Sequence, residues 1–229
     1  MEPLPPRPAW AGELWLGSDY CLIKGKTGTT RPHAHYAHQV LIAPEGQVHA
    51  LIAGQAQCGQ VLVIESGQEH AILAAHQPVI TLFAEPLAFD LPTLHRCCVQ
   101  TGADLELLAH TARNLPRRAL DTRVARALER IRSVNDETLP ADVLAREASI
   151  SLSQLERLFR TELGLSVRRL VLWQRLRQAL KSALGGSSLT TAAVAAGFSD
   201  SAHLSRMARS QFGIRADQTL RHFVLRILE

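Results

Sequence analysis

The spacing of hydrophobic residues changes near residue 119 of the chain. Before this point, short apolar runs lie between Gly and Pro turns, a pattern that is typical of β-strands. The predicted strands are Tyr20–Lys24, Gln39–Ala43, Val48–Ala53, Val61–Glu65 and Val79–Phe83. After it, apolar residues recur three and four positions apart, as at Val124, Leu128 and Ile131, which predicts helices. The change predicts two domains, joined by a short helical segment around Ala103–Asn114 and the basic stretch Pro116–Arg118.

The composition is that of a globular protein. Of the 229 residues, 46% are hydrophobic and 20% are charged, which excludes a disordered, collagen-like or disulfide-stapled chain. No apolar run approaches the roughly 18 residues that span a bilayer, and the proline-rich start, Met1–Pro6, lacks the pattern of a secretory signal. No Cys-x-x-Cys pair occurs among the four cysteines, which are Cys21, Cys58, Cys97 and Cys98. We therefore expect a cytoplasmic protein with free thiols.

Positive charge is concentrated in the second half of the chain. Residues 1–119 contain 8 Lys and Arg against 10 Asp and Glu, whereas residues 120–229 contain 17 against 11. Histidine has the opposite distribution, with eight of its ten copies before residue 119. A basic helical domain favours an anionic partner, nucleic acid before membrane, although a solvated basic face would carry the same charge.

The helical half contains an internal repeat. Residues 144–150 align with 192–198 at an offset of 48, and residues 155–160 align with 204–209 at an offset of 49. The two copies end alike, in Leu163-Gly164-Leu165 and in Phe212-Gly213-Ile214. Each copy predicts a helix, a tight turn and a second helix.

Turn and cap residues mark both units. In the first, Pro140 suits the opening turn of a helix that ends near Ser149, and the hydroxyl of Ser151 can cap the next helix, which ends at Gly164. The residues expected to be buried on this second helix are Leu152, Leu155, Leu158 and Phe159. In the second unit, Gly197 permits the turn, and a cap is expected from Ser199 or Asp200. The residues expected to be buried there are Leu204, Met207, Ala208 and Phe212.

Two such units on one basic domain indicate a pair of helix-turn-helix motifs, in which the second helix enters the major groove of DNA. Close approach needs short polar side chains, and arginines bind guanine edges or phosphates. An ordinary helical hairpin with a solvated polar face is the alternative, and the tandem arrangement favours DNA binding. The residues predicted to contact DNA are Ser153, Gln154, Glu156, Arg157, Arg160, Arg168, Ser201, Ala202, Ser205, Arg206 and Arg209.

This half of the chain resembles the AraC/XylS family of bacterial transcription regulators. Residues 151–164, 174–180 and 195–206 match that family's two helix-turn-helix subdomains and linker helix, and the similarity extends over about residues 120–222. The resemblance implies double-stranded promoter DNA as a partner, with RNA polymerase as a second. It also implies a homodimer, formed through the N-terminal domain or through the helix at Ala103–Asn114.

The resemblance further implies an α+β fold. A small N-terminal cupin-like antiparallel β-barrel would be followed by an all-α domain of two helix-turn-helix subdomains, joined by a linker helix from about Ser166 to Ala183. We expect a cupin-like effector or sensor domain at residues 1–100, a helical linker and candidate dimerisation segment at 101–119, and the DNA-binding domain at 120–229.

The N-terminal half matches the general cupin pattern. Gly28 precedes His33-Ala34-His35, Gln39 stands in the place of the usual glutamate, and a second motif runs from Gly59 to His70. Positions 33, 35 and 39 share strand parity, and His70 would arrive from a neighbouring hairpin. His33, His35, Gln39 and His70 are therefore the candidate ligands of a divalent transition metal with open positions for an effector.

A histidine-lined barrel mouth is equally a polar pocket for a small organic effector without metal. Gln39 in place of a glutamate removes a negative charge and lowers the expected metal affinity. Three further histidines, His38, His49 and His76, have the wrong parity or context and are expected on the surface or in the pocket wall.

We expect a DNA-binding transcription regulator that responds to a small molecule or a metal. We do not expect an enzyme, because no acid–base pair or nucleophile arrangement accompanies the histidines. A metal-dependent cupin enzyme with a helical appendage is the alternative from a different class. A non-specific DNA-binding protein is the third, and it predicts a steep salt dependence with little sequence discrimination.

Overall fold

The computed structural model describes residues 11–133, 139–213 and 220–228. The chain divides into two compact units. The first, here the β-unit, comprises residues 1–116 and 208–229, and the second, here the helical unit, comprises residues 117–207. Residues 208–229, which the sequence assigns to the DNA-binding domain, group with the β-unit because the last strand pairs with the first. The domain bounds drawn from the sequence therefore stay a prediction.

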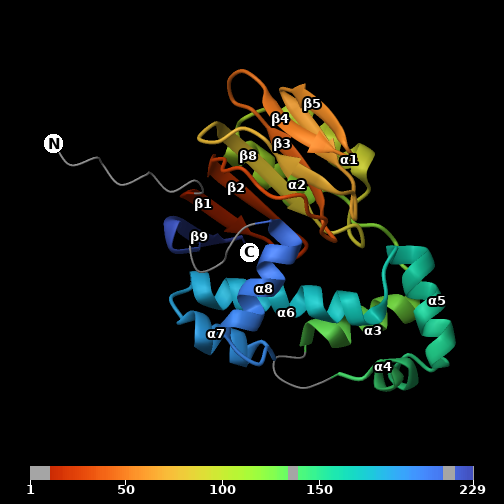
Figure 1. The fold of residues 1–229 in the computed structure, drawn as a ribbon. Helices are drawn as coiled ribbons and strands as arrows, with labels where there is room; N and C mark the ends of the chain where they lie inside the picture. The colour runs from red at the N-terminus through yellow and green to blue at the C-terminus, as the bar shows by residue number, and fades with distance from the viewer. Residues whose placement is uncertain (1–10, 134–138, 214–219, 229) are drawn as a thin grey trace. The chain divides into compact units, whose positions relative to one another are not determined.

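Two sheets form the β-unit (Figure 1). The six-stranded sheet has the order β6-β3-β8-β2-β1-β9, and the three-stranded sheet has the order β5-β4-β7. Neighbouring strands run antiparallel, except that β9 runs parallel to β1. The strands are β1 Ala11–Leu16, β2 Tyr20–Lys26, β3 His38–Ile42, β4 Val48–Ile52, β5 Gln55–Gly59, β6 Val61–Ile64, β7 His70–Ile72, β8 Pro78–Ala84 and β9 Phe223–Ile227.

The core of the β-unit lies between the two sheets. Its buried residues come from the six-stranded sheet, as Leu41 and Ile64 do, and from the three-stranded sheet, as Ala50 and Ile72 do. All residues of β3 are buried, because the second sheet covers one face of this strand and α1 contacts it from the other side.

Two helices, α1 (Leu91–Thr101) and α2 (Leu105–Asn114), pack on the six-stranded sheet (Figure 1). Asp90 and Asp104 cap them, each accepting a backbone N–H three residues on. Tyr20 on β2 joins the sheet to this layer, since its hydroxyl donates to the carbonyl of Ala109 at 3.4 Å. The helix expected around Ala103–Asn114 is thus confirmed as α2.

The helical unit contains the two repeated helix pairs. Its helices are α3 Thr122–Ser133, α4 Ala141–Glu147, α5 Leu152–Leu163, α6 Val167–Leu184, α7 Leu189–Ala195 and the first turns of α8 Ser201–Phe212, which continues into the β-unit. The expected linker helix is confirmed as α6, whose 18 residues extend about 27 Å at 1.5 Å per residue. In Figure 1, α5 and α7 lie at opposite ends of α6.

The predicted stop of α5 and the predicted glycine of the second turn both adopt a left-handed backbone. Gly164 ends α5 in the left-handed conformation with φ 69°, and Gly197 stands in the second turn with φ 77°. A short 3-10 turn, η1 (Leu220–His222), precedes β9. No helix within the described ranges has the length and apolar character that a membrane span requires.

The buried stripes of the second helices are narrower than the spacing predicts. Leu155, Phe159, Leu204 and Ala208 are buried as expected. Leu152, however, is 44% exposed, because it opens α5 at the edge of the packed interior. The remaining residues expected inside are only partly buried, and they are Leu158, Met207 and Phe212.

Candidate functional site

The outer face of α5 carries the first group of predicted DNA contacts. Ser153, Arg157 and Arg160 are exposed, and Glu156 is partly exposed. The helix starts at a capping box: the Ser151 hydroxyl accepts the N–H of Gln154, and the side-chain oxygen of Gln154 accepts the N–H of Ser151 at 3.0 Å. Gln154, predicted as a base-reading residue, is thus exposed and also holds the start of its own helix.

The outer face of α8 carries the second group. Ala202, Arg206 and Arg209 are exposed, whereas Ser201 and Ser205 are half-buried. Of the two predicted caps, Asp200 makes the backbone bond: its carboxylate accepts the N–H of His203 at 2.6 Å.

That hydrogen bond and the charge of Arg206 lower the pKa of Asp200. A carboxylate at this helix start also complements the positive end of the helix dipole. Asp200 therefore helps to fix the end of α8 that a helix-turn-helix motif presents to DNA.

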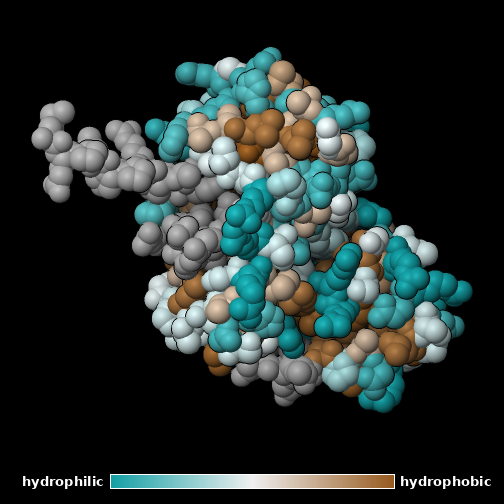
Figure 2. Space-filling model, in the orientation of Figure 1, coloured by the Kyte–Doolittle hydropathy of each residue, from teal (hydrophilic) through white to brown (hydrophobic). Residues whose placement is uncertain are grey.

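Arg168 is exposed on the first turn of α6. None of the predicted DNA-contacting residues is buried, so each is accessible in the described structure. Figure 2 shows hydrophilic surface over α5 and over α8 on the face turned to the viewer. Two second helices thus offer cationic, polar outer faces, which is what reading the major groove requires.

The second candidate site is a cluster of three histidines in the β-unit. One ring nitrogen each from His33, His35 and His70 lies within 4.8 Å of the others. The ring centroids are 5.8 Å apart for His33 and His35, 4.2 Å for His33 and His70, and 5.0 Å for His35 and His70. The structure therefore brings together the three histidines that the sequence selects.

The backbone reason for this gathering differs from the predicted one. Residues 33–37 form no strand, so shared strand parity does not position His33 and His35. Instead, His33 and His70 form an isolated antiparallel bridge, with reciprocal N–H to carbonyl bonds of 3.0 and 2.9 Å. The His35 carbonyl accepts the N–H of Gly67, which ties the same loop to the turn before β7.

Each histidine of the cluster has its Nδ1 atom against a backbone carbonyl. The partners are Arg31 for His33, Ala37 for His35 and Gln68 for His70, at 2.8, 2.9 and 2.9 Å. A neutral ring that donates from Nδ1 keeps a lone pair on Nε2, and metal-binding histidines are commonly oriented in this way. The Nε2 atom of His70 is buried and has no hydrogen-bond partner among the described residues.

Burial keeps these imidazoles neutral. Desolvation is the largest cause for each ring: it lowers the pKa of His33 to about 4 and that of His35 to about 3, and it also lowers the pKa of His70. The charge that a protonated His70 would carry lowers the pKa of His33 and His35 further. The cluster is therefore suited to a cation ligand, since a neutral imidazole binds metal and a charged one does not.

Gln39 completes the predicted set. It is buried on β3, and its side-chain oxygen lies 3.1 Å from Nε2 of His35. Both ring nitrogens of His35 thus face oxygen atoms, although a neutral ring carries only one proton. A cation shared by Nε2 and the amide oxygen would satisfy both atoms, as would a turned amide group whose N–H donates to Nε2.

The other histidines of this region stand apart from the cluster. His38 is buried, and its Nδ1 accepts the N–H of Ser66 at 3.1 Å. His49 and His76 are exposed. Three further residues lie at the cluster that the sequence did not indicate: Phe83 on β8, and Phe212 and Gly213 at the end of α8.

Residues 144–222 match the helix-turn-helix domain family. No curated protein sequence matches the chain. Among solved structures, apo ToxT from Vibrio cholerae matches 90% of this chain and 98% of its own with a TM-score of 0.61, and its 9% identity limits the likeness to the fold. ToxT with an unsaturated fatty acid bound matches 86% of this chain and 93% of its own, at a TM-score of 0.57 and 9% identity.

An AraC-type DNA-binding regulator from Chromobacterium violaceum is 27% identical over 44% of this chain and 92% of its own, at a TM-score of 0.42. The matched residues begin within α4 and include α5, α6, α7 and α8, and the likeness to the ToxT fold extends over the β-unit as well. Residues 144–222 thus match a helix-turn-helix domain, and the chain as a whole shares its fold with ToxT.

Proposed function

We propose that this chain is a transcription regulator of the AraC/XylS type, that it binds two adjacent major-groove segments of promoter DNA with α5 and α8, and that its histidine cluster is the effector site. The observation that carries the proposal is the pair of capped helix-turn-helix units, each of which exposes arginines on its second helix. Successive major-groove segments on one face of DNA lie about 34 Å apart. The roughly 27 Å linker helix α6 is suited to hold two reading helices at a separation of that order.

The predicted DNA-contacting residues would have two different roles. Arg157, Arg206 and the serines near the helix starts would contact base edges, because the N-terminal part of a recognition helix enters the groove. Arg168 on α6 would contact phosphate, as would Arg160 and Arg209 towards the helix ends. The resemblance to AraC/XylS regulators adds RNA polymerase as a further proposed partner. Dimerisation would use the β-unit or α2.

The histidine cluster fits a divalent transition metal. The donor set is rich in nitrogen: two buried imidazoles and the half-buried one of His33, all with Nδ1 against carbonyls, lie with the amide of Gln39. The Nε2 atom of His70 has no hydrogen-bond partner among the described residues. Such donors favour zinc, copper, nickel or iron over calcium and magnesium. A bound metal would supply a Lewis-acidic centre to which a small effector could attach, while these residues orient it and exclude water.

The proposal is tested by selecting bound duplexes from a random pool with the full chain, with and without zinc. We expect a single preferred sequence of two half-sites, and recovery that depends on metal or on an added effector. Affinity that falls steeply with salt and shows no sequence preference would replace this proposal by non-specific binding. Metal analysis of the purified chain and of a His33→Ala/His35→Ala variant decides whether the effector is a metal.

A metal-dependent enzyme is the second candidate, because three clustered histidines are also the donor set of some catalytic zinc centres. It predicts turnover that needs the metal and persists when both reading faces are mutated. Loss of site-specific DNA binding by those same mutations, without metal-dependent turnover, would support transcription regulation as the function of the chain.

A further inference from the structure

The end of α8 lies against the histidine cluster. The ring of Phe212 is 5.9 Å from the ring of His35 and 5.9 Å from that of Phe83, measured between centroids. Phe83 itself stands edge-on to His35 at 5.3 Å. The buried imidazole of His35 therefore has two phenyl rings beside it, one from β8 and one from the last residue of α8.

Gly213 makes an even closer approach. A Cβ atom at this position would lie 2.8 Å from Nδ1 of His33 and 2.9 Å from the carbonyl oxygen of Arg31. These two atoms form the hydrogen bond that orients the His33 ring. Since real Cβ atoms do not approach so closely, only glycine lets the end of α8 reach this hydrogen bond.

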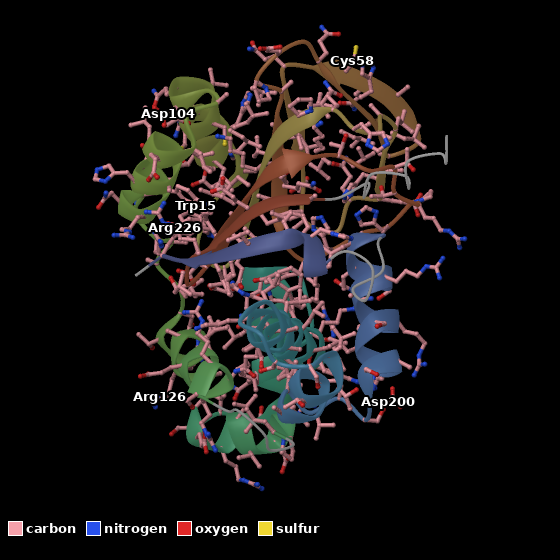
Figure 3. All side chains as sticks on the ribbon, turned by 90° about the vertical axis from the view of Figure 1, so that its left-hand side faces the viewer. Trp15, Cys58, Asp104, Arg126, Asp200 and Arg226 are labelled. Atoms are coloured by element: carbon pink, nitrogen blue, oxygen red, sulfur yellow. The ribbon has the colours of Figure 1, made fainter. Side chains whose placement is uncertain are left out.

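The chain beyond α8 is tied to the same unit a second time. Strand β9 pairs with β1 from Gly12↔Phe223 to Leu16↔Ile227. Arg226 on β9 lies over the ring of Trp15 at 4.3 Å and forms an ion pair with Glu106 on α2 at 3.0 Å. Figure 3 shows Trp15 and Arg226 next to each other on their neighbouring strands. Strand β9, which follows α8 in the chain, is therefore anchored to the β-unit.

We propose that Phe212 and Gly213 belong to the effector site, and that occupancy of the histidines is transmitted to DNA binding through α8. The inference rests on the proposed function, because it assigns the regulation of the same site. A metal held by His33 and His35 would fix the two rings on which Phe212 and Gly213 lie. Since α8 is one continuous helix from Ser201 to Phe212, a change at its last turn also acts on its DNA-facing start.

The repeat provides a matched pair of variants for the first step. Gly164 ends α5 as Gly213 ends α8: their N–H groups donate to the carbonyls of Arg160 and Arg209, and their φ angles are 69° and 66°. A Cβ at Gly164 meets nothing within 4 Å. Gly164→Ala and Gly213→Ala therefore introduce the same left-handed strain, but only the second disturbs His33.

The readout for this pair is the visible absorption of cobalt titrated into the full chain. We expect Gly213→Ala to weaken cobalt binding at least about tenfold, as loss of a supporting contact to a metal ligand does. Gly164→Ala should bind cobalt as the wild type does. Equal affinities for the two variants would overturn the assignment of Gly213 to the site.

Coupling to DNA is tested with Phe212→Ala, which keeps every proposed metal ligand. The affinity for the selected duplex is measured by fluorescence anisotropy with and without cobalt. In the wild type we expect the two affinities to differ by about fivefold or more, the usual size of a coupling between sites. In Phe212→Ala the ratio should approach one although cobalt still binds. Gln211→Ala, one residue earlier on the same turn, should keep the wild-type ratio.

The outcomes separate the two proposals. A wild-type chain that binds no cobalt removes the metal from the proposed function and this inference with it. Cobalt binding with a ratio that Phe212→Ala leaves unchanged overturns the inference alone. A wild-type ratio of one despite cobalt binding also overturns it, because binding free energies that are coupled must change together.

Discussion

Ser149 and Gly197 occupy the same place in the two helix-turn-helix turns, and both have a left-handed backbone, with φ 58° and 77°. In each turn the N–H of the following residue donates to the carbonyl five positions earlier, at 3.0 and 2.9 Å. The same turn is therefore built twice, once with the residue that this conformation favours and once with a serine. The first turn holds strain that the second does not.

Ser149→Gly should stabilise the protein. The left-handed conformation costs a residue with a side chain about 1–2 kcal/mol, and the greater freedom of glycine in the unfolded chain offsets about 0.5–1 kcal/mol of that. We expect a net gain of about 0.5–1 kcal/mol in the free energy of unfolding, measured by urea denaturation. Ser149→Ala keeps the strain and serves as the control. A glycine variant less stable than this alanine variant would contradict the assignment of strain.

Two variants at the capping box of α5 distinguish a structural role of Gln154 from a role in reading DNA. Ser151→Ala should cost about 1 kcal/mol of stability, because it leaves helix N–H groups without an acceptor. Gln154→Glu retains the side-chain oxygen and so should keep the stability of the wild type. If Gln154 also reads a base, this variant changes the preferred sequence in a duplex selection. An unchanged preference would confine Gln154 to the cap.

Arg206 and Arg168 should differ in what their loss does to DNA binding. Arg206→Ala removes an exposed cation from the reading face of α8, and we expect a cost of about 1–3 kcal/mol at one base position with relaxed preference there. Arg168→Ala should weaken binding to all sequences alike and make the salt dependence shallower. Competition titrations with single-base variants of the selected site measure both. An Arg206→Ala protein with intact site preference would remove α8 from base reading.

Local patterns predict much of this fold because the repeat is encoded locally. Ser151, Gly164 and Gly197 act as the cap, stop and turn residues that their chemistry favours. Leu152 follows the same spacing but lies at the end of the packed interior, so its periodicity does not bury it. The spacing of apolar residues indicates which face of a helix is buried, but it does not indicate where along the helix the core ends.

Contacts between residues that are far apart in the sequence limit how much of the fold and of the site can be predicted from local patterns. Strand β9 is not among the predicted strands, although its residues Phe223–Ile227 include strong strand formers, and its place beside the distant strand β1 cannot be read from local sequence. His33, His35 and His70 are recognisable by their motif, yet a backbone bridge and a loop place them, and not a shared strand. Phe212 carries only the signal of a helix core position, so no local pattern connects it with His35.

The buried histidines predict a loss of stability in acid for the metal-free protein. In the unfolded chain, histidine has a pKa near 6.5, while His33 and His35 titrate near 4 and 3 when folded. The unfolded state therefore binds more protons between these values, and the stability present above about pH 6.5 falls as the pH approaches 4. His35→Phe should flatten this part of the curve, measured as unfolding free energy against pH with a chelator present. A slope that the substitution leaves unchanged would assign the acid sensitivity to other groups.

The division of the chain predicts how DNA-binding fragments behave. Residues 117–213 contain α3 to α8 and both helix-turn-helix units, whereas residues 120–229 also contain β9 without its partner β1. Both fragments should select the same DNA sequence as the full chain, because the reading faces are complete in each. The longer fragment should self-associate more, since an unpaired strand with exposed Val224 and Ile227 is a template for pairing between molecules. Selection from a random duplex pool tests the first expectation, and sedimentation at several concentrations tests the second. A folded 117–213 fragment without sequence preference would show that the β-unit takes part in reading DNA. Equal self-association of the two fragments would show that β9 does not promote pairing between molecules when β1 is absent.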